Sequence, residues 1–238
     1  MANPDQHRRL LALGRRHGLP DDTIAKLGAL LDALVADPLA PTAVRDPDRA
    51  LDDHLADSLV ALELNEVRQA RTIVDLGSGA GVPGLPLAIA LPADVVLVES
   101  NARKCAFIER ALASCEIANA TVICARAEGF TDGLERFDLV TARALAPLPV
   151  VAEYAAPLLR VGGALLVWRG RRNPDEEAVG AEAGAQLGLE VREPVHVSPY
   201  KGAHHRHLQL MLKVRSTPPG FPRRPGVARK RPLGQRGR

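Results

Sequence analysis

The stretch that decides the fold is Arg71-Thr-Ile-Val-Asp-Leu-Gly-Ser-Gly-Ala-Gly-Val-Pro-Gly-Leu-Pro-Leu-Ala-Ile-Ala-Leu91. Residues 72–76 form a short apolar run that predicts a buried strand. Three glycines follow within five positions, at Gly77, Gly79 and Gly81. The apolar run 85–91 predicts a helix, and proline is well tolerated near the start of a helix. The stretch therefore predicts a strand, a glycine turn and a helix.

The turn fits two classes of ligand. Gly79 to Gly84 match the dinucleotide fingerprint G-x-G-x-x-G, and Glu99 stands where that motif has its ribose-binding acid. However, Asp75 lies two residues before Gly77, where a carboxylate would repel a pyrophosphate. It would suit S-adenosylmethionine, which carries an ammonium and a sulfonium but no phosphate. We therefore expect a methyl-donor site. A nicotinamide or flavin site, and a tight turn without any ligand, are the alternatives.

The bulk composition is that of a globular protein with one full domain and a small appendage. Of 238 residues, 46% are hydrophobic and 25% are charged, but only 3% are aromatic. The three cysteines, at positions 105, 115 and 124, form no C-x-x-C pair, so we expect buried thiols in a reduced, cytoplasmic protein without a metal site. No apolar run approaches the length of a membrane span.

The order of the predicted elements indicates an α/β fold. Three helical segments come first, at about 5–18, 21–35 and 47–64. From residue 71 strands alternate with helices, which is typical of a mostly parallel, Rossmann-like sheet with helices on both faces. The predicted strands are 72–76, 94–99, 120–124, 137–141 and 164–168, followed by a hairpin-like pair at 189–195 and 208–214. The predicted helices of this part include 101–115, 148–159 and 174–187.

Polar side chains follow successive predicted strands, at the edge of the sheet where ligands bind. Glu99 ends the second strand, Glu128 follows the third, and Arg143 follows the fourth. The fifth strand is followed by Arg169, Arg171 and Arg172. Arg143 stands among small apolar residues, where a guanidinium either binds a ligand or forms a structural ion pair. We favour the ligand.

The end of the chain is strongly basic. From Ser216 onward it carries seven cations and no acid, although the net charge of the whole chain is only +3. Its Pro, Gly and Arg content predicts disorder, and its charge favours contact with a polyanion over the alternative of a solubilising tail without a partner. We therefore divide the chain into an N-terminal helical subdomain (1–65), a catalytic domain (66–215) and a basic disordered tail (216–238).

Several blocks together resemble the RsmG (GidB) family of bacterial 16S rRNA guanine-N7 methyltransferases. They are Val44-Arg-Asp-Pro47, His54-Leu-Ala-Asp-Ser58, Asp75-Leu-Gly-Ser-Gly-Ala-Gly-Val-Pro-Gly-Leu-Pro86, Arg126-Ala-Glu128, Ala142-Arg-Ala144, Arg169-Gly170 and Arg206-His-Leu208. The resemblance implies a class I S-adenosylmethionine-dependent methyltransferase in the cytoplasm, whose partner is 16S rRNA or the small ribosomal subunit. A non-enzymatic RNA-binding assembly factor on the same scaffold is a further alternative.

The resemblance also implies cofactor contacts at Gly77, Val82, Ala127, Glu128 and Arg143. To these the charge argument adds Asp75, Gly79, Gly81 and Glu99. Guanine N7 has a free lone pair and no proton, so we expect no general base and give Arg143 a positioning role. The candidate RNA-binding residues are Arg169, Arg171, Arg172, Lys201, Arg206, Arg223, Arg224, Arg229, Lys230 and Arg231.

Overall fold

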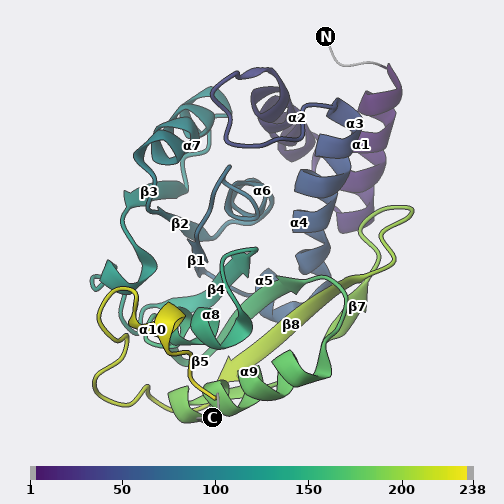
Figure 1. The fold of residues 1–238 in the computed structure, drawn as a ribbon. Coiled ribbons are helices and arrows are strands. Elements are labelled where there is room, and N and C mark those ends of the chain that lie inside the picture. Colours follow the sequence, from purple (N-terminus) through teal and green to yellow (C-terminus); the bar gives the residue numbers. More distant parts are fainter. Residues whose placement is uncertain (1–3, 235–238) are drawn as a thin grey trace.

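The computed structural model describes residues 4–234, and within them one mixed sheet organises the chain. The strand order is β3-β2-β1-β4-β5-β8-β6, with β7 paired to β8 (Figure 1). The first five strands are parallel, whereas β8 runs antiparallel to β5, β6 and β7. The strands are β1 (Thr72–Leu76), β2 (Asp94–Glu99), β3 (Ala120–Cys124), β4 (Phe137–Arg143), β5 (Leu159–Arg169), β6 (Leu189–Val191), β7 (Val195–Val197) and β8 (Arg206–Lys213).

The predicted α/β class is confirmed, and the first three strands have the predicted bounds. Strand β5 begins five residues earlier than predicted, because Gly162 and Gly163 interrupt its apolar pattern while the backbone continues to pair with β4. The strand predicted over 189–195 is instead two short strands, β6 and β7. Pro194 lies between them, and proline has no N–H to give to a ladder.

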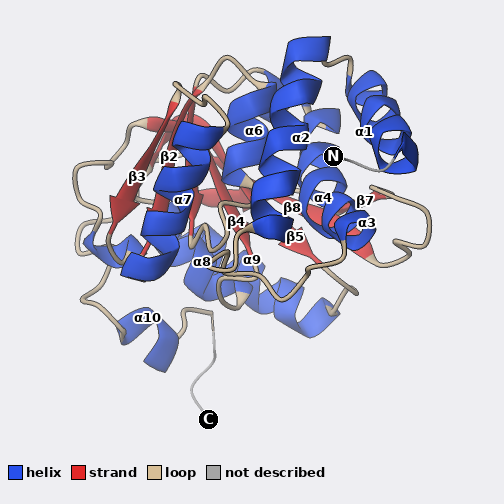
Figure 2. Cartoon of the chain, turned by 90° about the horizontal axis from the view of Figure 1, so that it is seen from above, coloured by secondary structure: helices blue, strands red, loops and turns tan. Residues whose placement is uncertain are grey.

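Helices cover both faces of the sheet, as predicted (Figure 2). Alternate residues of the central strand point to opposite faces, so Ile73 joins one apolar core and Val74 the other. The first core takes side chains from α1 (Pro4–His17), α2 (Asp21–Ala36), α4 (Asp57–Leu59), α6 (Gly84–Ala90) and α7 (Ala102–Ser114). The second takes them from α8 (Leu148–Ala155), α9 (Pro174–Leu187) and α10 (Val227–Lys230).

The third N-terminal segment is helical but irregular. It consists of α3 (Pro47–Ala50), the π-helical turn η1 (Leu51–Ala56), α4, the 3-10 turn η2 (Val60–Glu63) and, after one residue, α5 (Asn65–Arg68). The sequence predicts one regular helix there. The spacing of its leucines is compatible with a regular α-helix and also with this irregular series of helical turns, so it does not distinguish them. The N-terminal helices share one core with the sheet. The division of the chain at residues 65 and 215 stays a prediction.

The basic end of the chain has a defined course up to Gly234, which differs from the predicted disorder. Ala228 of α10 is buried in the second core, and Phe221 and Leu233 pack against that core. In Figure 1 the yellow α10 lies beside α8. These apolar anchors are few and widely spaced among the arginines, so composition alone does not reveal them. Residues 235–238 lie outside the described part of the chain.

Two findings bear on what the fold can do. Within residues 4–234, no helix is both long and apolar enough to cross a membrane. In the same part of the chain, no group of three or more His, Cys, Asp and Glu side chains could hold a metal ion.

Candidate active site

Two cavities lie at the carboxyl ends of the parallel strands, on either side of the loop that follows β4. The first, here the glycine-turn cavity, has a volume of about 160 Å³ and is lined by Gly77, Val98, Ser100, Ala125, Arg126, Ala127, Glu128, Leu145, Tyr154 and Arg229. The second, here the arginine cavity, measures about 500 Å³ and is lined by Asp53, His54, Asp57, Arg143, Ala144, Trp168, Arg169, Gly170 and Arg206.

The predicted strand, glycine turn and helix are present between β1 and α6. The three glycines have positive φ angles of 70°, 60° and 81°. Residues that carry a Cβ atom adopt such angles only at a cost in conformational free energy. Gly77 donates its N–H to the carbonyl of Val98 at 2.8 Å, which holds the turn against β2. A methyl group at Gly77 would lie 2.6 Å from Cδ1 of Leu145. Gly77 is therefore required both for the turn and for the close approach of the loop after β4.

Asp75 does not reach either cavity, which corrects the charge argument made from the sequence. Its side chain is fully buried, with Oδ1 accepting from the Thr141 hydroxyl at 2.8 Å and Oδ2 from the Gly84 N–H at 3.3 Å. Burial raises the pKa of Asp75 to about 6, against the opposing effect of these hydrogen bonds. Asp75 thus ties β1 to β4 and to the start of α6, and it lines neither of the two cavities.

Glu99 also supports the turn in this structure. Its Oε2 accepts from the N–H of Gly79 at 3.0 Å, and its Oε1 accepts from the N–H of Asn101 at 2.8 Å. The side chain is buried, and it does not line the glycine-turn cavity. Val82 is likewise buried, in the first apolar core. These two predicted cofactor residues therefore do not line the glycine-turn cavity, and neither do Gly79 and Gly81.

Ala127 and Glu128 do line the glycine-turn cavity, together with Gly77. They belong to the 3-10 turn η3 (Ala127–Gly129) that follows β3. Tyr154 of α8 also lines this cavity, and its buried hydroxyl lies near the Arg229 guanidinium with no other partner among the described residues. Burial raises the pKa of Tyr154, with Glu128 adding to the effect and the charge of Arg229 opposing it. A buried hydroxyl of this kind is costly unless a ligand or water pairs with it.

Arg143 lines the arginine cavity and not the glycine-turn cavity. Its Nη1 donates to Oδ2 of Asp57 at 2.9 Å and to the carbonyl of Asp53 at 2.7 Å. Asp57 is almost fully buried and also accepts from Nε of Arg206, at 3.2 Å. The alternative considered from the sequence, a structural ion pair of Arg143, is therefore present in the structure. Arg143 also lines the arginine cavity, so its ligand role stays a prediction beside this ion pair.

The π-helical turn explains how one short segment supplies both contacts to Arg143. At its end the N–H of Asp57 bonds to the carbonyl of Asp52 and not to that of Asp53. The carbonyl of Asp53 is therefore left to accept from Arg143. Such π turns are frequent at functional sites.

Several residues of the arginine cavity were missed as site residues from the sequence. Asp53 accepts from the Tyr200 hydroxyl at 2.7 Å, and Trp168 donates its indole N–H to the carbonyl of Asp57 at 2.6 Å. His54 bonds to Thr42 through Nε2, while its buried Nδ1 has no partner among the described residues. Burial and the charge of Arg143 lower the pKa of His54. The only sequence feature that points to this part of the site is the block from His54 to Ser58, which contributes to the family resemblance but carries no predicted role in binding or catalysis.

The candidate RNA-binding residues after β5 and in the loop before β8 are mostly exposed and partly paired. Arg169 pairs with Glu176 at 2.6 Å while still lining the arginine cavity. Arg172 is held between Glu177 and Glu193, at 2.7 and 2.6 Å. Arg171 lies 3.4 Å from the His205 ring, and Lys201 is exposed. Arg206 contacts both Asp57 and Tyr200.

The five candidate cations of the tail divide into two groups. Arg223 forms an ion pair with Glu153, which is buried in α8, and Arg229 donates to the carbonyl of Leu145 at 3.1 Å. Arg224, Lys230 and Arg231 are exposed, and their side chains make no hydrogen bond to the described residues. Only this second group is free to meet a polyanion without losing an internal contact.

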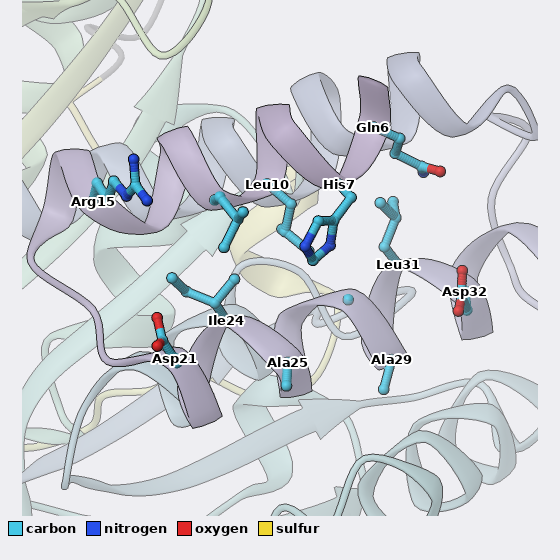
Figure 3. Close-up of a pocket in the computed structure, with 12 residues that line it drawn as sticks. Gln6, His7, Leu10, Arg15, Asp21, Ile24, Ala25, Ala29, Leu31 and Asp32 are labelled. Carbon is cyan, nitrogen blue, oxygen red and sulfur yellow. The ribbon is translucent and has the colours of Figure 1, made fainter. Parts of the chain in front are cut away.

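A larger hollow lies elsewhere, between α1 and α2, and measures about 730 Å³ (Figure 3). Leu10, Ile24 and Leu31 point into it, with Arg15 and Asp32 at its ends. None of the predicted site residues lines it, and it is not at the carboxyl edge of the sheet.

Comparison with known proteins gives a consistent match. The family model described as rRNA small subunit methyltransferase G matches residues 37–208. The chain is 36% identical to "Ribosomal RNA small subunit methyltransferase G" of Desulfitobacterium hafniense, over 96% of this chain and 98% of that protein. It is 38% identical to the protein of the same name in Chloroflexus aggregans, over 95% and 98% of the two chains.

Solved structures with this fold are more distant in sequence. Precorrin-6y C5,15-methyltransferase of Geobacter metallireducens aligns with a TM-score of 0.51 at 19% identity, over 65% of this chain and 87% of its own. The fibrillarin pre-rRNA processing protein of Methanococcus jannaschii aligns with a TM-score of 0.52 at 17% identity, over 67% and 74%. At these identities the likeness concerns the fold, which is that of class I methyltransferases.

Proposed function

The chain belongs to the ribosomal RNA small subunit methyltransferase G family, and we propose that it transfers a methyl group from S-adenosylmethionine to N7 of a guanine in small-subunit rRNA. The observation that carries the proposal is the pair of cavities on either side of the loop after β4. One suits a nucleoside and the other suits a base attached to a phosphate chain. The predicted cytoplasmic location agrees with such a substrate and is part of the proposal.

The residues of the glycine-turn cavity fit the nucleoside end of S-adenosylmethionine. Its volume of about 160 Å³ is below the roughly 300–1,000 Å³ of sites that enclose whole small molecules, so it suits one end of the cofactor. Glu128 and the hydroxyl of Tyr154 offer acceptors for the amine of an adenine. Glu99 ends β2, where the ribose-binding acid of such folds stands, and releasing Gly79 would free its Oε2.

The arginine cavity suits the target guanine and its phosphates. Arg143, Arg169 and Arg206 line it, and guanidinium groups bind phosphate well. Asp53 and His54 line the cavity with groups that can hydrogen bond to the edge of a guanine, while Trp168 offers an aromatic surface. These groups come from four separate segments, which together define the shape of the cavity.

The chemistry assigned to these residues is positioning. S-adenosylmethionine supplies a methyl group that its sulfonium has already activated, and guanine N7 accepts it through a lone pair without losing a proton. Arg143 is fixed by Asp57 and by the Asp53 carbonyl, so it can hold the base at a constant place beside the loop after β4. The carboxylates around the cavity also favour the positive charge that the base acquires.

Binding measurements separate this proposal from the oxidoreductase alternative. We expect calorimetry to detect S-adenosylmethionine binding and no NADH binding to the purified protein. The named relatives are methyltransferases, so the comparisons do not favour an oxidoreductase. Tight NADH binding without methyl-donor binding would refute the proposal.

Mapping of modified guanines separates an enzyme from an assembly factor. In rRNA from cells that lack this protein, one N7-methylguanine of the small subunit should be missing. The wild-type chain should restore it, and a Gly77→Asp variant should not, because a side chain at Gly77 collides with Leu145. Full restoration by that variant would contradict the cofactor site, and an unchanged methylation map would contradict the enzyme.

A further inference from the structure

The basic end of the chain reaches the glycine-turn cavity, although it lies outside the residues that the family model matches. Residues 216–234, here the C-terminal strap, are anchored at two points. Arg223 pairs with Glu153 of α8, a glutamate that is 1% exposed, and Thr217 accepts from the buried Lys213 of β8. The strap is therefore held by buried charged groups as well as by the apolar contacts of Ala228, Phe221 and Leu233.

Between these anchors and Gly234, the strap contacts the two loops that form the cavity. The N–H of Gly226 donates to Oε1 of Glu128 at 3.1 Å, in the loop after β3. Nη2 of Arg229 donates to the carbonyl of Leu145 at 3.1 Å, in the loop after β4. Arg229 itself lines the cavity, beside Tyr154.

We propose that the C-terminal strap is part of the cofactor site: Arg229 forms the wall against which the adenine of S-adenosylmethionine lies, and Gly226 and Arg229 hold the loops after β3 and β4 around it. This inference rests on the proposed function. A guanidinium is planar and stacks on flat rings, so Arg229 suits a neutral base better than the cationic end of the cofactor. Glu128, already oriented by Gly226, keeps its Oε2 for the amine of that base.

The proposal is tested by measuring the affinity of the full-length protein for S-adenosylmethionine, S-adenosylhomocysteine and adenosine. Arg229→Ala should weaken all three by about tenfold, and by the same factor, because the lost contact concerns the shared nucleoside. Arg229→Gln keeps a donor for the Leu145 carbonyl but loses the charged plane, so its affinities should fall in between. Arg224→Ala is the matched control, since it removes one cation from the same segment without touching the cavity.

Several outcomes would overturn the inference. Unchanged affinities for Arg229→Ala, or an equal loss for Arg224→Ala, would remove the strap from the cofactor site. Tighter binding by Arg229→Ala would show that the strap obstructs the site. If the wild-type chain bound S-adenosylmethionine but none of the variants differed from it, the proposed function would stand and this inference would fail. If the wild type bound no S-adenosylmethionine, the proposed function itself would fail.

Discussion

Asp75 illustrates how a residue can stand at the expected place in the sequence and still have another role. In the unfolded chain its pKa is about 3.9, whereas burial raises it to about 6 in the folded protein. The folded state therefore favours the protonated acid. The stability that this preference contributes is fully present below pH ~4 and is lost as the pH rises through about 6.

Replacing Asp75 by Asn should remove this pH dependence. An amide can still accept from the Gly84 N–H and can donate to the Thr141 hydroxyl, so the variant should fold. Its free energy of unfolding should change less between pH 4 and pH 7 than that of the wild type. Urea unfolding at several pH values measures this, and parallel pH profiles for the two proteins would contradict the raised pKa.

At Gly77 both the backbone conformation and the packing disfavour a side chain. Its φ is +70°, and an added Cβ would lie 2.6 Å from Leu145. Gly77→Ala should cost about 1–2 kcal/mol of stability from the backbone, plus the displacement of Leu145, and should weaken cofactor binding. Gly18→Ala is a matched control, since Gly18 has the same φ and open space around it.

Chemical unfolding and calorimetry of both glycine variants measure the two effects separately. The control should show only the backbone cost and an unchanged affinity for S-adenosylmethionine. If both variants lost equal stability and equal affinity, the close approach of the new methyl group to Leu145 would have no effect on either quantity.

At the scale of elements, α1 is held to the rest of the chain partly by His17, at its last position. Burial lowers the pKa of His17 to about 4, with Arg16 and Arg68 adding to the effect and Glu63 opposing it. The folded state therefore favours the neutral imidazole. The resulting stability is present above pH ~6.5 and is lost as the pH falls toward 4, opposite in sign to the effect of Asp75.

A His17→Gln variant should lose this dependence and be less destabilised than the wild type when the pH falls from 7 to 4.5. The helix signal in circular dichroism during urea unfolding measures the change. A wild type and a variant with the same pH response would contradict the lowered pKa of His17.

The strands that the sequence predicts well are short, mostly apolar segments bounded by turns. The bounds of β1, β2 and β3 could be read directly, because each is a short run of apolar residues between turns. The π turn η1 could not, because its leucines have the spacing of an ordinary helix. The partner of Arg143 was equally hidden, since Asp57 lies 86 residues earlier in the chain.

At the scale of the whole molecule, the number of basic side chains that can bind RNA depends on which of them already have partners within the protein. The sequence predicts the entire tail as a polyanion-binding segment. In the structure Arg223 and Arg229 have internal partners, which leaves Arg224, Lys230 and Arg231 exposed. The first two positions look no different from the others in the sequence, because buried Glu153 and the loop after β4 are far away in the chain.

A triple variant, Arg224→Ala with Lys230→Ala and Arg231→Ala, should weaken RNA binding and flatten its salt dependence. The slope of log K against log salt should fall by about 0.7 for each phosphate contact that is lost. Affinity for S-adenosylmethionine should not change. Filter binding at several salt concentrations measures the slope, and identical slopes for wild type and variant would show that these cations do not meet RNA.

The position of the C-terminal strap also determines when, during synthesis, the protein becomes able to bind its cofactor tightly. During translation, all strands of the sheet emerge before residues 216–234 do. A nascent chain with a finished sheet and glycine turn would still lack Arg229, and so would hold its cofactor loosely. A premature stop codon just after β8 would leave the protein permanently without the C-terminal strap, and its glycine-turn cavity would lack Arg229.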